Sequence, residues 1–383
     1  AYEIGSGLLG SEMCIRDRAG DRELVERQVS TTALAGAGFS VVFSLFCILM
    51  AHPLLRLLQV PAAILPIAAG YLRVVFAGLI FTFLYNFLAA TLRALGDSKS
   101  ALYFLMISSV LNIFGDLFFV QVLGWGAPGC ALSPVLSEAL CCILCLGYIQ
   151  RRVPVLQLGR RWLVFDPRLL RKTVSYGWAS AMQQATVQLG KIAVQAIVNT
   201  MGVQTMAAFT AASRIDDFAY TPQQNIGHAM TTLMAQNRGA GKPQRVRQGF
   251  VCGMRIEFAY TIGLSLVCFL GAEGIMGLFV QDPAVQVLGA RFLRLIALLY
   301  FLPAATNGIQ GYFRGMGDLK VTLRSSILNM VARVPAAALL VLCFHLEIEA
   351  LPWSYAVGWL LMLAYELPKL WRCLHQQEDP PEM

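Results

Sequence analysis

The sequence predicts an all-α membrane protein built from two related halves. Its 383 residues are 57% hydrophobic and only 14% charged, and its mean hydropathy is +0.61, whereas soluble domains carry about a quarter charged residues. Apolar runs of about 20 residues, long enough to cross a bilayer core as helices, recur along almost the whole chain. A short motif also occurs twice at a fixed offset, which indicates a duplication.

The repeated motif covers residues 93–99 and recurs at 314–320, with Arg, Gly, Asp and Lys in identical positions. Alone, such a match is expected about once by chance in a chain of this length. The same offset of 221 residues also superposes four further pairs: Ala19-Gly20 on Ala240-Gly241, Leu72-Arg73 on Leu293-Arg294, Asn86 on Asn307 and Val120 on Val341. A register held over about a hundred residues indicates two homologous halves.

We expect ten membrane-spanning helices, near residues 30–52, 66–92, 100–123, 127–150, 170–199, 203–235, 250–271, 284–313, 321–344 and 351–373. Ala240-Gly241 follows the second long span of its half, so Ala19-Gly20 should follow the second span of the first half. Two spans are then missing from this sequence. The complete protein is expected to have twelve helices in two sixes, related by a pseudo-twofold axis along the membrane normal, with a cavity between them.

Residues 1–18 fit nothing that follows and resemble translated sequencing-adaptor read-through, so we expect a non-native segment there. The predicted first lobe is 19–150, a cytoplasmic linker is 151–167, the second lobe is 168–376, and 377–383 form a cytoplasmic tail. Basic residues gather in alternate loops, near 93–99, 151–172, 238–247 and 314–324, which the positive-inside rule places in the cytoplasm. The net charge of +8 therefore indicates membrane orientation and not nucleic-acid binding.

The first half carries a candidate pair of intramembrane polar residues. Asn112 and Asp116 are four apart, so their side chains share one helix face. Ionisable groups at the bilayer centre are costly and are therefore functional candidates. A poorly solvated Asp116 would take up a proton near neutral pH, as a proton-coupled carrier needs; an aspartate held neutral or paired for structure is the alternative. Asn86 either faces the same pocket or joins two helices.

The second half offers a polar cavity wall. Lys191 lies mid-span after Gln184 and Gln188, and we expect it to pair with Asp216 or Asp217 of the next span. Two readings stay open, a pair that breaks during transport and a fixed pair that joins two helices.

Asn307 and Gln310 add amides to the same wall. Glu257 is expected to be solvated at the cytoplasmic end of its span, and Glu366 to reach the cytoplasmic interface.

Signals for catalysis are absent from the sequence. The four histidines are scattered singly, and neither a Gly-rich phosphate loop nor a nucleophile elbow occurs. Cys141, Cys142 and Cys145 read as small apolar residues of a helix rather than metal ligands. We therefore expect no enzymatic activity, no cofactor and no metal site, and we expect a monomer in a lipid bilayer.

Two stretches resemble a known family. Ala207-Ala-Phe-Thr-Ala-Ala-Ser-Arg-Ile-Asp216 and the segment 235–242 are similar to the eighth helix and following loop of the multidrug and toxic compound extrusion (MATE) transporters. Residues 314–320 and 333–335 resemble the family's tenth and eleventh helices. The resemblance runs from about Ala19 to Arg372. It implies a V-shaped twelve-helix carrier of the bacterial inner membrane, with its first two helices missing here and its C-terminus cytoplasmic. Such carriers export small organic cations in exchange for protons or sodium.

The resemblance also suggests where the ion couples. The chain resembles the DinF-like, clostridial-type branch. The DinF-like and archaeal branch uses an Asn-x-x-x-Asp pair on helix five, matched by Asn112 and Asp116, together with an acid on helix one. The branch resembling NorM uses acids on helices seven and ten, where this chain has glutamines, Lys191 and Asn307. The resemblance therefore favours proton coupling through the first half. A lipid-linked oligosaccharide flippase of the same superfamily, a membrane scaffold and a membrane-embedded transferase are the alternatives.

Overall fold

The computed structural model describes residues 22–57, 64–153 and 164–376, and within these ranges every regular element is a helix. The predicted adaptor-derived segment, the predicted tail and most of the predicted linker lie outside the described residues. The chain divides into two compact units, residues 1–177 and 178–383, whose boundary falls inside one helix. The lobe limits expected from the sequence stay a prediction, and each unit is described by itself.

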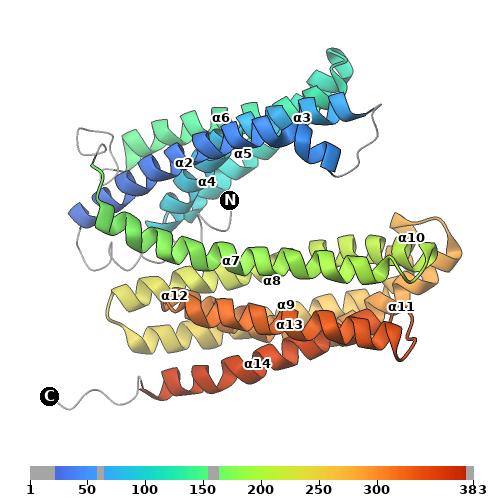
Figure 1. Ribbon diagram of the computed structural model, residues 1–383. Helices are drawn as coiled ribbons and strands as arrows, with labels where there is room; N and C mark the ends of the chain where they lie inside the picture. The colour runs from blue at the N-terminus through green and yellow to red at the C-terminus, as the bar shows by residue number, and fades with distance from the viewer. Residues whose placement is uncertain (1–21, 58–63, 154–163, 377–383) are drawn as a thin grey trace. The chain divides into compact units, whose positions relative to one another are not determined.

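The helices follow one another with short connections (Figure 1). Unit 1 contains α2 (Arg22–Leu57), α3 (Leu65–Ala77), α4 (Leu79–Ala94), α5 (Ser98–Leu117), the π-helical turn η1 (Phe118–Val122), α6 (Gly126–Arg152) and the start of α7 (Pro167–Val198). Unit 2 contains the rest of α7, then α8 (Val203–Gly239), α9 (Pro243–Leu270), α10 (Ala272–Phe279), α11 (Pro283–Leu299), α12 (Phe301–Gly315), α13 (Leu319–Leu342) and α14 (Ala350–Gln376).

Each of the ten predicted spans coincides with a helix or with a bent pair of helices. Among the described residues, five single helices are long and apolar enough to cross a membrane, and two bent pairs bring the number to seven. The other three helices, α7, α8 and α14, are also long. Of these, α7 and α8 carry more polar side chains, which a span covered by its neighbours tolerates. The prediction of an all-helical membrane protein is confirmed.

The two halves share local features at the offset found in the sequence. The pair α3 and α4 bends by 40° around Gly78, and the pair α11 and α12 bends by 50° around Tyr300. The offset of 221 residues carries Gly78 to the residue before Tyr300. The connections after the two bent pairs also match, because Gly96 and Gly317 have φ of 90° and 74° in the left-handed region, where glycine avoids a side-chain clash.

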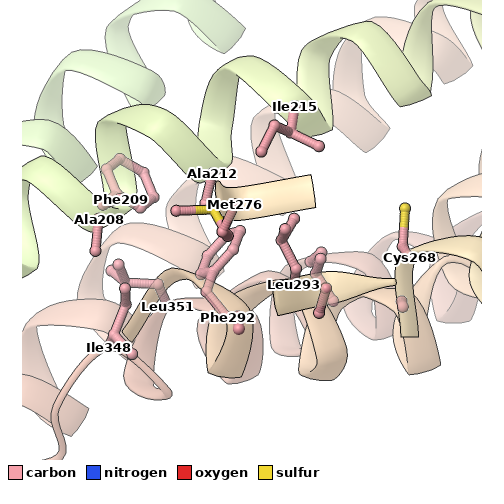
Figure 2. Close-up of a cluster of buried hydrophobic side chains, with 14 of the residues drawn as sticks. Ala208, Phe209, Ala212, Ile215, Cys268, Met276, Phe292, Leu293, Ile348 and Leu351 are labelled. Atoms are coloured by element: carbon pink, nitrogen blue, oxygen red, sulfur yellow. The ribbon is translucent and has the colours of Figure 1, made fainter. Parts of the chain in front are cut away.

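The core of unit 2 is a cluster of apolar side chains from six helices and the loop before α14 (Figure 2). Phe292 of α11 lies at its centre and makes edge-to-face contacts with Phe209 of α8 and Tyr355 of α14. Met276 of the short helix α10 is also fully buried there. This core fixes α8 and α11 against each other and so positions the polar groups that α8 carries one turn further along.

Candidate functional site

The pair predicted in the first half lies at the contact between α5 and α6. The Asn112 amide donates to Ser133 Oγ at 3.1 Å, and the Ser133 hydroxyl donates back to the Asn112 carbonyl at 2.8 Å. Gly115 makes this contact close, since a Cβ there would lie 2.5 Å from Ser133 Oγ. The pair of reciprocal bonds therefore fixes α5 against α6 one turn before Asp116.

Asp116 has a different environment from Asn112. Its Oδ1 is buried and has no hydrogen-bond partner among the described residues. The π-helical turn η1 begins two residues later, and such wide turns occur frequently at functional sites. The structure thus places Asp116 half-buried beside an irregular helix segment, with no ion pair to another described residue.

Asn86 joins a different polar group in unit 1. It is buried, and its amide donates to the carbonyl of Thr82 in its own helix at 2.8 Å. The Thr82 hydroxyl donates to the carboxylate of Glu138 on α6. Sequence reasoning missed Glu138, although a single acid inside the apolar run of α6 is a signal that could have found it.

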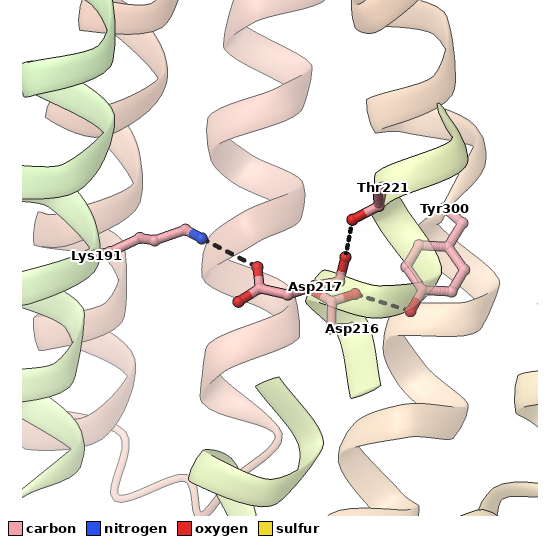
Figure 3. Close-up of polar contacts among 5 residues, drawn as sticks. All are labelled: Lys191, Asp216, Asp217, Thr221 and Tyr300. Carbon is pink, nitrogen blue, oxygen red and sulfur yellow. Dashed lines mark hydrogen bonds and ion pairs between the residues drawn. The ribbon is translucent and has the colours of Figure 1, made fainter. Parts of the chain in front are cut away.

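Lys191 pairs with only one of the two acids predicted for it, and the other acid binds a tyrosine (Figure 3). Lys191 Nζ lies 3.0 Å from Asp217 Oδ1, whereas Asp216 accepts a hydrogen bond of 2.8 Å from the Tyr300 hydroxyl. The side chains of Lys191 and Asp217 are 50% and 66% exposed in the chain, so the pair is open to its surroundings. Tyr300 stands at the bend between α11 and α12, and Asp216 therefore ties α8 to that bend.

A second cation approaches this region from α13. The Arg333 guanidinium lies 3.1 Å from the centre of the Tyr355 ring, a cation–π contact. The charges of both Arg333 and Lys191 act on Asp216. The 221-residue offset aligns Asn112 with Arg333, so equivalent positions carry an amide in one half and a cation in the other.

Asn307 of α12 belongs to a buried polar network. Its side-chain amide donates to the backbone carbonyl of Gln223 at 2.5 Å and to Glu257 Oε1 at 3.1 Å. The side-chain amide of Gln223 donates to the Thr261 hydroxyl at 2.7 Å, and this hydroxyl donates to the backbone carbonyl of Glu257. The network joins α8, α9 and α12.

Gln310, one turn further along α12, belongs to another network. Its amide donates to Glu366 Oε1 of α14 at 3.3 Å, and the Ser325 hydroxyl donates to the same oxygen. Gln183 of α7 donates to Gln310 at 3.3 Å and to Ser326 at 3.0 Å. Of the two other predicted glutamines, Gln184 is half-buried and Gln188 is exposed, and no hydrogen bond joins either to these networks in the described part of the chain.

The expectation that Glu257 and Glu366 are solvated is wrong. Both side chains are fully buried, at 0% exposed. The positions of the two acids near the ends of their spans suggested access to water. However, α12 packs against both α9 and α14 and covers the two carboxyls. A sequence pattern along one helix does not reveal which neighbour covers it.

No three His, Cys, Asp or Glu side chains are grouped so that they could hold a metal ion, within the described ranges. The polar groups of the site are instead carboxyls, amides and two cations. Such groups can bind a proton, an alkali cation or a charged organic molecule.

Comparison with known proteins agrees with the architecture. The family model described as MatE matches residues 19–118 and 179–339. The chain is 29% identical over 304 residues to the "Probable multidrug resistance protein YpnP" of Bacillus subtilis, covering 79% of this chain and 68% of that protein. It is 28% identical over 379 residues to "Probable multidrug resistance protein YoeA" of the same organism, covering 94% and 81%.

Solved structures are similar in fold. One described as "Outward-facing conformation of a multidrug resistance MATE family transporter of the MOP superfamily" superposes with a TM-score of 0.92 at 19% identity, over 99% of this chain and 85% of that chain. A MOP superfamily transporter from Pyrococcus furiosus superposes with a TM-score of 0.91 at 20% identity, over 99% and 85%. At these identities the likeness concerns the fold alone.

Proposed function

The chain belongs to the MatE family, and on this premise we propose that it is a multidrug efflux antiporter that exports small organic cations in exchange for protons. Family membership and the relatives named as multidrug resistance proteins support this assignment. In this proposal the chain is a monomer in the bacterial cytoplasmic membrane and works by alternating access. It carries solutes and catalyses no reaction.

The proposal of proton coupling depends on one observation, the environment of the Asp116 carboxyl. Asp116 is half-buried, and its Oδ1 is buried without a hydrogen-bond partner among the described residues, so a partner is needed there. We propose that either a proton or a cation serves as this partner. The two ligands therefore compete for one group, which is the requirement for exchange of one against the other.

The mechanism follows from this competition. With Asp116 ionised, a cationic solute from the cytoplasm binds and neutralises it. Opening to the other side lets a proton displace the solute, and the neutral carboxyl returns and releases this proton to the cytoplasm. Asn112, fixed by Ser133, holds the adjacent turn of α5 in place during this exchange. The coupling free energy expected for such a linkage is about 1–3 kcal/mol, or about 5–150-fold in affinity.

The test is efflux of the fluorescent cation ethidium from loaded right-side-out membrane vesicles that contain the full chain. Asp116→Asn keeps the shape of the side chain and cannot titrate, so efflux driven by a pH gradient should fall by about 5–150-fold. Glu347→Gln, at a side chain 68% exposed near the start of α14, is the matched control and should leave efflux unchanged. Retained efflux in Asp116→Asn contradicts the role, and efflux driven by a sodium gradient alone contradicts the proton.

A further inference from the structure

Helix α12 is held by two buried carboxyls. Most of its side chains are buried, and it packs against α8, α9, α13 and α14. Asn307 binds Glu257 on one flank, and Gln310 binds Glu366 on another, three residues along. Both acids are 0% exposed, and in each the Oε2 atom is buried without a hydrogen-bond partner among the described residues.

The ionised form of these groups is poorly accommodated. A buried carboxylate needs a cation or several donors, and the cost of leaving it without them is several kcal/mol. Glu257 receives one side-chain hydrogen bond, from an amide, and no salt bridge is formed by it in the described ranges. A neutral carboxylic acid avoids most of this cost, so the packed arrangement favours the protonated form.

The charged and titratable neighbours are few. Tyr260, on the same helix as Glu257, interacts with it but donates its hydroxyl to the Ala219 carbonyl of α8. Arg314, on α12, is the cation that acts on Glu366 and reduces the cost of ionising it. From α13 the neutral Ser325 donates to Glu366, and from α8 the backbone carbonyl of the neutral Gln223 accepts from Asn307, the partner of Glu257.

We propose that Glu257 and Glu366 are proton-binding residues of unit 2, which hold α12 in its packed position while protonated and release it when ionised. Release gives each proton to water that enters as α12 separates from its neighbours, and repacking takes the proton back. The bend at Tyr300 separates α12 from α11 and lets it move as its own element. This inference rests on the proposed function and extends it. It adds a proton-dependent helix to the second half, whereas the sequence favoured proton coupling through the first half.

Hydrogen–deuterium exchange of the full chain in lipid nanodiscs tests this without transport. Amide exchange of residues 301–315 is followed from pH 6 to pH 9 and divided by the intrinsic rate at each pH. If opening releases one proton, the opening constant rises by up to about tenfold per pH unit, and two protons give up to about a hundredfold. Each of Glu257→Gln and Glu366→Gln should reduce the wild-type slope by one proton, and the double variant should show none. Glu347→Gln should keep the wild-type slope.

Each outcome decides the proposal. A flat profile in the wild type overturns it, whether or not the variants fold. A single variant that keeps the wild-type slope removes that carboxyl from the proposal, as permanent pairing of Glu366 with Arg314 would predict. Asp116→Asn should leave the α12 profile unchanged, so loss of coupling through Asp116 and failure of the α12 inference are separate results.

Discussion

Asp97 and Asp318 occupy equivalent positions in the repeated motif but make different contacts. Each precedes a helix, α5 or α13, as its N-cap residue. The Asp97 carboxylate accepts hydrogen bonds from the Ser100 amide at 3.1 Å and the Tyr148 hydroxyl at 2.8 Å. The Asp318 side chain makes no capping hydrogen bond. The same residue type at the same sequence position therefore contributes differently to stability.

Asp97→Ala should lower the stability of the protein by about 1 kcal/mol, the usual cost of losing an N-cap. Asp318→Ala is the matched control and should cost less, because no cap bond is lost. Thermal unfolding in detergent measures both. Equal losses in the two variants would show that the side-chain cap contributes nothing.

The same cap has a defined pH dependence. Burial alone would raise the pKa of the Asp97 carboxyl, but hydrogen bonds from Tyr148 and Ser100 outweigh it and hold the pKa below its ordinary value of 3.8. A lowered pKa means that the charge stabilises the fold above pH 3.8 and that this contribution disappears as the pH falls through the lowered value. The difference in stability between wild type and Asp97→Asn should therefore be constant near neutral pH.

At the residue scale, the sequence predicted one contact between consecutive helices. The expected partner of Lys191 was Asp216 or Asp217, and the structure selects Asp217. Whether that pair breaks during transport stays a prediction. Glu257 was misread and Glu138 was missed, because their hydrogen-bond partners lie on α12 and α4, far away in the chain. The local sequence pattern does not show that a distant helix buries a side chain.

Close packing of α8 and α12 depends on glycine. A Cβ at Gly311 would lie 2.7 Å from the Gly227 carbonyl oxygen, and one at Gly315 would lie 2.7 Å from the Thr231 carbonyl oxygen. Both obstacles are backbone atoms, which cannot rotate away. The spacing of four residues puts Gly311 and Gly315 on one face of α12, as at other close helix contacts in membranes.

Gly311→Ala should therefore destabilise unit 2 by about 1–3 kcal/mol, the usual cost of forcing extra atoms into a packed core. Gly263→Ala on α9 is the matched control, since nothing lies within 4 Å of a Cβ there, and alanine is the better helix former. Its stability should be unchanged or slightly higher. Thermal unfolding in detergent compares the two, and an unchanged melting temperature in Gly311→Ala would contradict the close approach.

The sequence predicted the positions of the helices at all ten expected spans but not the breaks in two of them. Residues 66–92 and 284–313 each read as one continuous apolar run, yet both bend. Gly78 lies at the first break, directly against the Val135 side chain of α6. Contact with another helix, rather than a local breaker such as proline, accompanies this bend, so the local pattern carries little sign of it.

At the scale of the whole molecule, the two ends of unit 2 carry opposite charge. Among the described residues, the end that holds the α8–α9 and α12–α13 connections carries Arg238, Lys242, Arg314 and Lys320 against Asp318. At the other end, Arg294 pairs with Glu273 at 2.8 Å, and Arg291 lies 3.7 Å and 3.6 Å from the two acids before α14. The cations of that end are thus neutralised, which sharpens the asymmetry that sets orientation.

This asymmetry predicts that the C-terminus lies in the cytoplasm. Green fluorescent protein fused after Gln376 should fluoresce, and alkaline phosphatase fused at the same place should be inactive, because it matures only outside the cytoplasm. Phosphatase fused after Glu349, one span earlier, should be active, which controls for expression. The reverse pattern would mean that the basic end of unit 2 faces outward. The proposed efflux direction would then lose its support, since the cytoplasmic side is assigned from that basic end.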